Sequence, residues 1–145
     1  MDVFMAVKQT ETRQMSIRVL VVDDEEKLGR FVCMLLERMG YQASLCLSVD
    51  EAKRLLAQET WHLVISDIVL PGENGFDLIQ WLKHHYPNIP VVAMTAHSTE
   101  AANHRIRKLG FVAVLHKPFS VDQFQRVVQQ VGLPIEPLPI NDTFF

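Results

Sequence analysis

Four carboxylates in succession follow the most hydrophobic segment of the chain. The segment 17–22, IRVLVV, runs directly into Asp23, Asp24, Glu25 and Glu26. Two like charges ~4 Å apart repel by about 4 kcal/mol at an effective dielectric constant of about 20, so such a run is costly beside a buried strand. Asp24 or Glu25 could simply cap the helix that follows. A cation held among the carboxylates would explain the whole run.

Three other polar residues stand at the ends of apolar segments. Asp67, Thr95 and Lys117 each follow a run rich in valine and other apolar residues. Taken singly, they could be a turn residue, an ordinary strand end and a surface lysine. Together with the acidic run they supply what phosphoryl chemistry needs: carboxylates for Mg²⁺, and a hydroxyl and an ammonium for an anion. The set therefore favours a metal site in which one carboxylate acts as the nucleophile.

The elements that must position these residues can be predicted from apolar patterning. Five apolar segments without strict alternation are typical of strands buried on both faces, namely 17–22, 42–47, 62–66, 90–94 and 111–115. Helical periodicity lies in 25–39, 48–57, 75–86, 98–109 and 120–132, with capping-box spacing at Ser48–Glu51 and Ser120–Gln123. We therefore predict one α/β domain, a doubly wound (βα)5 flavodoxin-like fold with a five-stranded parallel sheet in the order 2-1-3-4-5.

That strand order has a consequence for the polar residues. Ligands of open parallel sheets bind outside the carboxyl ends of the strands, where the strand order reverses. Strands one and three are neighbours at this point, so we expect Asp23, Asp24 and Asp67 to converge in one cleft. Among the helices, 98–109 has few apolar residues, and we expect it to pack most loosely.

The composition is that of a soluble protein of one domain. The chain has 145 residues, 48% of them hydrophobic, and a net charge of −3 with Lys and Arg scattered, which predicts no direct contact with nucleic acid. With no apolar run near the ~20 residues of a membrane span and no signal peptide, we expect a cytoplasmic protein without membrane contact. Cys33 and Cys46 are expected to be reduced core thiols.

The two ends of the chain differ from its middle. We expect 1–16 to be a flexible N-terminal extension and 17–132 to be the folded domain. The last segment, 133–145, carries three prolines and is expected to be a tail without a further helix.

Four motifs carry a resemblance to a known family. They are VVDDE at 21–25, SDIVLPGENG at 66–75, MTAH at 94–97 and HKPFS at 116–120. Their content and order make 17–132 similar to the receiver domain of two-component response regulators, a fold also seen in the chemotaxis regulators. The resemblance implies a phosphorylation-controlled switch rather than an enzyme acting on other substrates. It also implies that the domain catalyses its own phosphorylation and dephosphorylation only.

The resemblance assigns a role to each polar residue. Asp67 matches the phospho-accepting aspartate, and Thr95 and Lys117 match the pair that binds the phosphoryl oxygens. The implied Mg²⁺ site consists of Asp24 as a direct ligand, Asp23 through water, Asp67, and the backbone carbonyl of Val69. Pro118 matches a proline that follows a cis peptide bond. The implied donor is a histidine kinase or a histidine phosphotransfer protein, and the face formed by 98–131 is expected to bind an output protein.

Two positions depart from the family pattern. Members often carry Tyr or Phe three residues before the lysine, where this chain has Val114. An aromatic residue, Phe111, follows Gly110 instead, and we expect it to be part of the core. Two further side chains, Val69 and His97, flank the path by which water reaches the phosphoryl group in this family. Because valine cannot orient water, we expect a long-lived phosphoryl-aspartate, unless the imidazole of His97 positions the water itself.

Three other classes of protein remain as alternatives. A Mg²⁺-dependent phosphatase with an aspartyl nucleophile usually needs an acid two residues after that nucleophile, where this chain has Val69. A flavodoxin-like cofactor binder would place a Ser/Thr/Gly loop, and not four acids, after the first strand. A phosphorylation-independent interaction module would not need the acidic set. A phosphorylation assay separates the last from the preferred interpretation.

Overall fold

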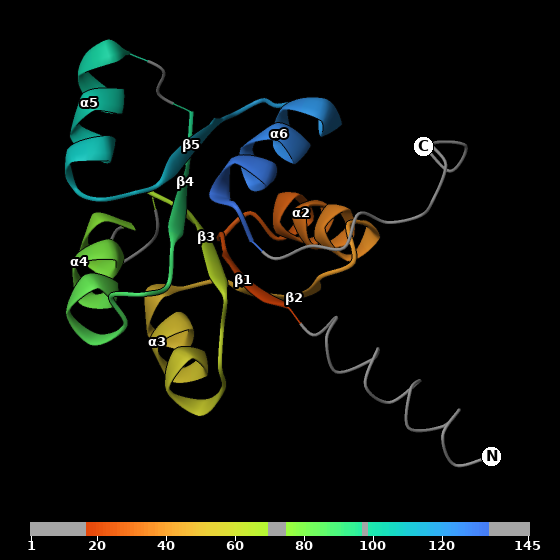
Figure 1. Cartoon of the computed structure of the whole chain (residues 1–145), viewed down its shortest axis with the longest axis vertical. Helices are drawn as coiled ribbons and strands as arrows, with labels where there is room; N and C mark the ends of the chain where they lie inside the picture. Colours follow the sequence, from red (N-terminus) through yellow and green to blue (C-terminus); the bar gives the residue numbers. More distant parts are fainter. Residues whose placement is uncertain (1–16, 70–74, 97–98, 134–145) are drawn as a thin grey trace.

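Five short strands form one parallel sheet in the order β2-β1-β3-β4-β5 (Figure 1). The computed structural model describes residues 17–69, 75–96 and 99–133. The strands are β1 (Arg18–Val22), β2 (Gln42–Cys46), β3 (Leu63–Asp67), β4 (Val91–Thr95) and β5 (Ala113–His116). The register pairs Val21 with Ile65 and Ser66 with Ala93, so the carboxyl ends of the three central strands reach the same edge.

One helix follows each strand. These are α2 (Glu26–Arg38), α3 (Val49–Gln58), α4 (Gly75–His85), α5 (Glu100–Lys108) and α6 (Val121–Val131). Helices α2 and α6 cover one face of the sheet, and α3, α4 and α5 cover the other (Figure 1). The predicted doubly wound, flavodoxin-like fold and its strand order are confirmed.

The core consists of two layers, one on each face of the sheet. In β1, Val19 and Val21 pack under α2 and α6, whereas Leu20 and Val22 pack under α3, α4 and α5. All four side chains are fully buried. Burial on both faces explains why β1 is apolar from Val19 to Val22 and does not alternate with polar residues there.

The helix starts confirm one capping box and correct another. Ser120 Oγ accepts the Gln123 N–H, and the Gln123 side chain accepts the Ser120 N–H, as predicted. Ser48 Oγ also accepts the Glu51 N–H, at 3.2 Å. The carboxylate of Glu51, however, accepts the Leu47 N–H instead of the Ser48 N–H, so the prediction of a reciprocal box was wrong here. The carboxylate reaches one residue further back along the chain.

The first helix has no side-chain cap. Glu25 is the N-cap residue of α2, and it makes no side-chain hydrogen bond to the helix. The interpretation that Asp24 or Glu25 serves only as a cap is therefore wrong. The carboxylates of this run must be explained by other contacts.

Helix α5 buries a single side chain completely, that of Ile106, in agreement with its few apolar residues. The last helix, α6, ends at Gly132, which has a φ of 75°. Leu133 still packs against the core, one residue beyond the predicted domain. The expectations for 1–16 and for most of the tail fall outside the described residues.

Both cysteines are free and buried, as expected. Burial, followed by the charge of a nearby glutamate, raises the pKa of Cys33 to about 11 and that of Cys46 to about 12. At neutral pH both are therefore thiols rather than reactive thiolates.

In the part of the chain that the structure describes, no helix has the length and apolar character needed to cross a bilayer.

Candidate functional site

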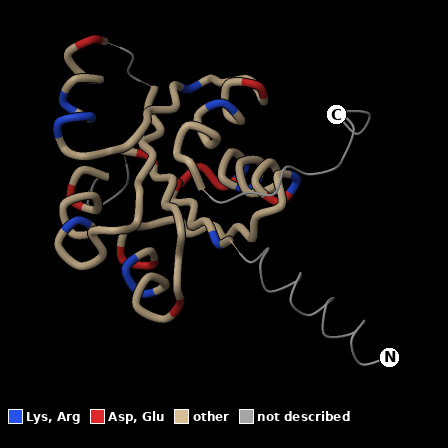
Figure 2. The backbone as a smooth tube through the Cα atoms, in the orientation of Figure 1, with Lys and Arg blue, Asp and Glu red and all other residues tan. Residues whose placement is uncertain are grey.

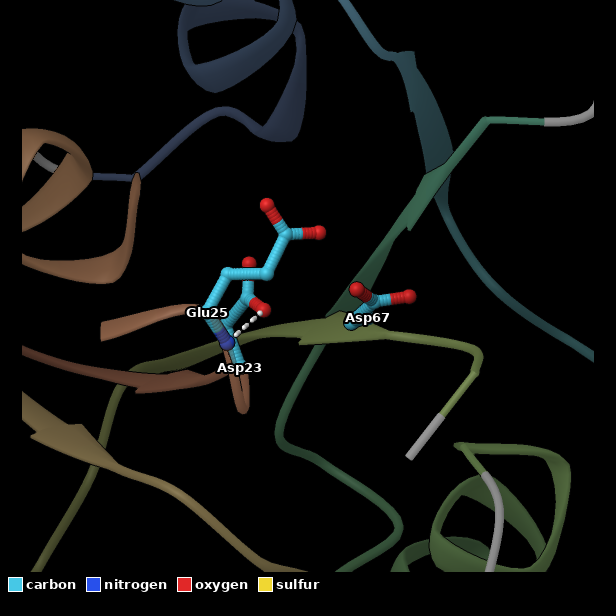
Figure 3. Close-up of side chains that lie close together, drawn as sticks. All are labelled: Asp23, Glu25 and Asp67. Atoms are coloured by element: carbon cyan, nitrogen blue, oxygen red, sulfur yellow. Dashed lines mark hydrogen bonds between the residues drawn. The ribbon is translucent and has the colours of Figure 1, made fainter. Parts of the chain in front are cut away.

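Three carboxylates converge at the carboxyl edge of the sheet. Asp23 directly follows β1, Glu25 lies two residues later, and Asp67 is the last residue of β3. One oxygen from each lies within 4.8 Å of the others (Figure 3). Asp23 is fully buried and Asp67 is 5% exposed, whereas Glu25 reaches in from the surface. We call these three residues the acidic cluster; Figure 2 shows the acidic run between β1 and α2.

The ammonium of Lys117 lies among all three carboxylates. Its Nζ is 2.6 Å from Asp67 Oδ2, 3.3 Å from Asp23 Oδ2 and 3.4 Å from Glu25 Oε1. A cation was expected among the acids, and the protein itself provides one in Lys117. A single ammonium does not balance three carboxylates, so the acidic cluster still offers oxygen ligands to a divalent cation.

Backbone groups fix the orientation of the two buried carboxylates. The Glu25 N–H donates to Asp23 Oδ1, and the Val69 N–H donates to Asp67 Oδ1, each at 2.9 Å. Because Oδ1 of Asp67 is held by the backbone and Oδ2 by Lys117, the carboxylate plane is fixed.

Helix α4 begins in direct contact with the backbone of Asp67. The Gly75 N–H donates to the Ile68 carbonyl at 3.2 Å. A Cβ at position 75 would lie 2.4 Å from the Asp67 carbonyl oxygen and 2.6 Å from Ile68 Cα. Glycine is therefore required at this position to bring α4 against the end of β3.

The structure brings together part of the set predicted from the sequence. Asp23, Asp67 and Lys117 meet as expected, but Glu25 rather than Asp24 is the third acid of the acidic cluster. Asp24 is exposed in the turn before α2. Glu25 belongs to the same acidic run, but the spacing alone could not show that its longer side chain reaches Lys117.

The remaining predicted residues lie close by, with one exception. Thr95 is fully buried at the end of β4, and its carbonyl accepts the Lys117 N–H at 2.8 Å. The Lys117–Pro118 peptide bond is cis, as the resemblance implied. Val69 is 62% exposed beside Asp67. His97 falls outside the described residues.

The two positions that depart from the family pattern both belong to the core. Phe111 is 4% exposed and packs under α3, α4 and α5, so the prediction that it is a core residue is confirmed. Val114 is partly buried against the same cluster. No aromatic side chain therefore occupies position 114 of β5.

Burial and charge shift two pKa values in the site. Burial raises the pKa of Asp23 above its ordinary value of 3.8, and the charge of Asp67 adds to this, whereas the Glu25 N–H and Lys117 oppose it. Burial alone would lower the pKa of Lys117, but its hydrogen bond to Asp67 and the nearby carboxylates outweigh that effect and raise it above 10.5. Lys117 therefore stabilises the fold fully below pH 10.5, and this contribution is lost as the pH rises through its pKa in the fold.

The raised pKa of Asp23 predicts a stabilising substitution. The folded protein binds the Asp23 proton more tightly than the unfolded chain does. The charged carboxylate therefore destabilises the fold increasingly as the pH rises above 3.8, and fully once the pH exceeds the pKa of Asp23 in the fold. Asp23→Asn removes the charge and keeps an acceptor for the Glu25 N–H. Without Mg²⁺ we expect its melting temperature at pH 7 to rise by about 3–5 °C, a gain on the order of 1 kcal/mol. Near pH 3 the gain should vanish.

Asp24→Asn is the matched control, because it makes the same change at the exposed neighbouring residue. We expect its melting curve to follow that of the parent protein at both pH values. An Asp23→Asn variant that melts lower than the parent at pH 7, or that differs equally at both pH values, would contradict the argument.

Residues 19–129 match the sequence family described as the response regulator receiver domain. The chain belongs to this family. The DNA-binding transcriptional regulator NtrC of Bradyrhizobium sp. (strain RP501 Parasponia) is 34% identical over 110 residues, which cover 76% of this chain and 23% of the relative. The phosphate regulon transcriptional regulatory protein PhoB of Escherichia coli (strain K12) is 32% identical over 130 residues, covering 88% of this chain and 57% of the relative.

Solved structures agree with this assignment. The non-phosphorylated HemR receiver domain from Leptospira biflexa is 29% identical, has a TM-score of 0.75, and covers 84% of this chain and 98% of its own. The chemotaxis response regulator CheY4 of Vibrio cholerae is 23% identical, with a TM-score of 0.76 over 80% of this chain and 98% of its own, and it supports the fold alone.

The receiver family sets the general function of this chain. Receiver domains are signalling domains regulated by phosphorylation, and the acidic cluster of this one is consistent with metal binding. The chain spans about a quarter of the length of the NtrC relative and just over half that of the PhoB relative.

Proposed function

We propose that Asp67 accepts a phosphoryl group from the phosphohistidine of a histidine kinase or a histidine phosphotransfer protein, in a Mg²⁺-dependent reaction. The observation that supports this most directly is the contact between a nearly buried Asp67 and the ammonium of Lys117, 2.6 Å away, within a group of three acids. The position of the acidic cluster at the point where the strand order reverses adds to this, since ligands of such sheets bind there.

The proposed step requires no proton from Asp67. A carboxylate oxygen of Asp67 attacks the phosphorus, a P–O bond forms, and the P–N bond to the donor imidazole breaks. The leaving nitrogen keeps the electron pair of that bond. Lys117, which now binds Asp67 Oδ2, would turn to a phosphoryl oxygen, and the Thr95 hydroxyl would donate to another.

Mg²⁺ fits the donor set of this site, because hard oxygen ligands outnumber the single ammonium. We propose that Asp23, Asp24, Asp67 and the backbone carbonyl of Val69 hold it. Glu25 is a further oxygen ligand within reach of the acidic cluster. When bound, Mg²⁺ offsets the negative charge shared by the carboxylates and the incoming phosphoryl group.

Asp24→Ala should weaken Mg²⁺ binding most, by about tenfold or more, because this residue would be a direct ligand. Asp23→Ala should weaken it less, because Asp23 would act through water. Asp24 is exposed, so the fold should be unaffected. Calorimetric or fluorescence titration with Mg²⁺ measures both, with Asp50→Ala on α3 as a surface control. If the Asp23 and Asp24 variants titrate like the parent protein, the metal site lies elsewhere.

An apolar hollow beside the acidic cluster suits the approach of a donor protein. It has a volume of about 410 Å³, and its lining includes Leu28, Phe31 and Phe119 next to Lys117. Phe31 is 38% exposed although it is large and apolar. A donor that packs on these side chains would bring its phosphohistidine to Asp67.

We propose the face formed by α5, β5 and α6 as the surface for an output protein.

Labelling of the purified chain with a small radioactive phosphodonor, such as acetyl phosphate, tests the proposed function. With Mg²⁺ we expect up to one acid-stable, base-labile phosphoryl group per chain. With a chelator in place of Mg²⁺ we expect almost none. Absence of labelling under both conditions would contradict the proposed function and favour a phosphorylation-independent interaction module. Equal labelling under both conditions would contradict the role of the metal.

A phosphatase acting on other substrates is less well supported. Such an enzyme needs an acid two residues after its nucleophile, and here that residue is Val69. We therefore propose that the chain catalyses only its own phosphorylation and dephosphorylation.

A further inference from the structure

Two buried polar atoms without partners lie in the same helix–sheet layer. In the part of the chain that the structure describes, Asn103 Oδ1, His116 Nδ1 and the hydroxyl of Tyr41 are buried and have no hydrogen-bond partner. Nearly all buried polar atoms in proteins have one, so each exception calls for an explanation. Asn103 belongs to α5 and His116 to β5, whereas Tyr41 lies under α2 on the opposite face of the sheet.

The strand register places His116 beneath α5. Val114 pairs with Ala93, and His116 pairs with Thr95. Val114 and Ala93 both belong to the core under α3, α4 and α5. Since alternate residues of a strand share one face, His116 and Thr95 also face this layer, at the carboxyl ends of their strands.

Asn103 approaches the same place from the helix. Ile106 is the core residue of α5, and Asn103 is half-buried one helical turn before it, on the same face of the helix. Helix α5 begins at the end of the sheet where β4 ends and runs back toward the start of β5, which it contacts (Figure 1). Asn103 therefore lies closer than Ile106 to the carboxyl edge of the sheet, where Thr95 and His116 are.

The two atoms are chemically complementary. The side-chain oxygen of Asn103 is a hydrogen-bond acceptor, and Nδ1 of His116, when it carries a proton, is a hydrogen-bond donor. With only Ile106 fully buried, α5 can shift without breaking many apolar contacts.

We propose that Asn103 and His116 are a pair of positioning residues that form a hydrogen bond, from Nδ1–H to Oδ1, when α5 shifts in the phosphorylated state. The inference rests on the proposed function, because the shift of α5 would follow the turn of Thr95 toward the phosphoryl group. This hydrogen bond would link α5 to the strand that leads into Lys117. It would take the place of the aromatic side chain that other receiver domains often carry at the position of Val114.

Formation of the hydrogen bond between Asn103 and His116 should strengthen the binding of a phosphoryl mimic at Asp67. The probe is beryllofluoride, a stable mimic of the aspartyl phosphoryl group, titrated in the presence of Mg²⁺. We expect His116→Leu and Asn103→Leu each to weaken its binding within the range of about 5–150-fold that is typical of coupled sites. The double variant should lose no more than either single variant, because one hydrogen bond is removed in all three. His116→Asn places an N–H donor near the position of Nδ1 and should restore part of the affinity.

Three measurements separate this hydrogen bond from a general structural effect. His104→Leu makes the same change at an exposed histidine of α5 and should leave beryllofluoride binding unchanged. Melting temperatures without the probe should be equal or higher for His116→Leu, because an unpartnered buried nitrogen is removed. In the parent protein, a slowly exchanging Nδ1 proton of His116 should appear in NMR spectra only when beryllofluoride is bound.

The outcomes distinguish the inference from the proposed function. If the parent protein binds beryllofluoride and both leucine variants bind it equally well, the hydrogen-bonded pair is wrong and the proposed function stands. Additive losses in the double variant would also reject the pair. If the parent fails to bind the probe, or if Asp67→Asn binds it as tightly as the parent, the proposed function fails and the inference fails with it.

Discussion

The Asp67→Asn variant should take up no phosphoryl group from a small phosphodonor in the presence of Mg²⁺. An amide oxygen is neutral and a poor nucleophile, so the loss relative to the parent protein should exceed about 100-fold. The substitution preserves the volume of the side chain and an acceptor for the Val69 N–H. Lys117 keeps its contacts with Asp23 and Glu25, so the fold should remain intact. Radiolabel per chain measures uptake, and circular dichroism measures the fold.

Asp50→Asn is the control for this experiment. Asp50 is an exposed aspartate in the first turn of α3, away from the acidic cluster, and its variant should label like the parent protein. Labelling that persists in Asp67→Asn would move the phosphoryl acceptor to another residue. Loss of the folded spectrum in that variant would instead call for Asp67→Glu, which keeps the charge but moves the carboxylate by one methylene group.

Val69→Asn should shorten the lifetime of the phosphorylated protein. Val69 is 62% exposed two residues after Asp67, and in the proposed mechanism it would flank the path by which water approaches the phosphoryl group. Valine can neither donate nor accept a hydrogen bond, whereas asparagine can do both and can orient the attacking water. One well-placed hydrogen bond of about 1.4 kcal/mol in the transition state corresponds to roughly tenfold faster hydrolysis. Decay of label in excess Mg²⁺, after removal of the donor, measures the rate.

Val69→Leu provides the matched control, because it keeps an apolar side chain of similar bulk and should decay at the parent rate or more slowly. His97→Ala should change the rate little. A large loss of rate in His97→Ala would assign the positioning of water to the histidine. Unchanged or slower decay in Val69→Asn would show that the residue at position 69 does not limit access of water.

The fold could be predicted from the sequence because its three central strands, β1, β3 and β4, are buried on both faces. Val19 and Val21 pack on one side of β1 and Leu20 and Val22 on the other, and four consecutive residues buried in this way must all be apolar. The strand order 2-1-3-4-5, predicted together with the fold, was also confirmed. Boundaries were less accurate where residues near a strand have other roles. Phe111 packs into the core before β5 begins at Ala113, so that strand starts two residues later than predicted.

The composition of the site could be predicted only in part. Asp23, Asp67 and Lys117 were expected together because the carboxyl ends of parallel strands share one edge of the sheet. Which other acid of the run joins them depends on the backbone of the turn, because this decides whether the side chain of Asp24 or that of Glu25 points toward Lys117, and the sequence pattern does not contain that backbone. Glu25 has an extended backbone at the helix cap, with φ −81° and ψ 94°, and its side chain meets Lys117. The unpartnered His116 nitrogen could not be expected from any motif.

The position of Lys117 also has a consequence for chemical selectivity. Small phosphodonors such as acetyl phosphate are mixed anhydrides, with one electrophilic centre at phosphorus and another at the acyl carbon. A free amine attacks the acyl carbon, and acetylation of the lysine would remove its charge. The carboxylates around Lys117 raise its pKa, so an even smaller fraction of it than of an ordinary lysine is the free amine that could attack. The same carboxylates would thereby disfavour acylation of the lysine and leave Asp67, the proposed nucleophile, to react with such a donor.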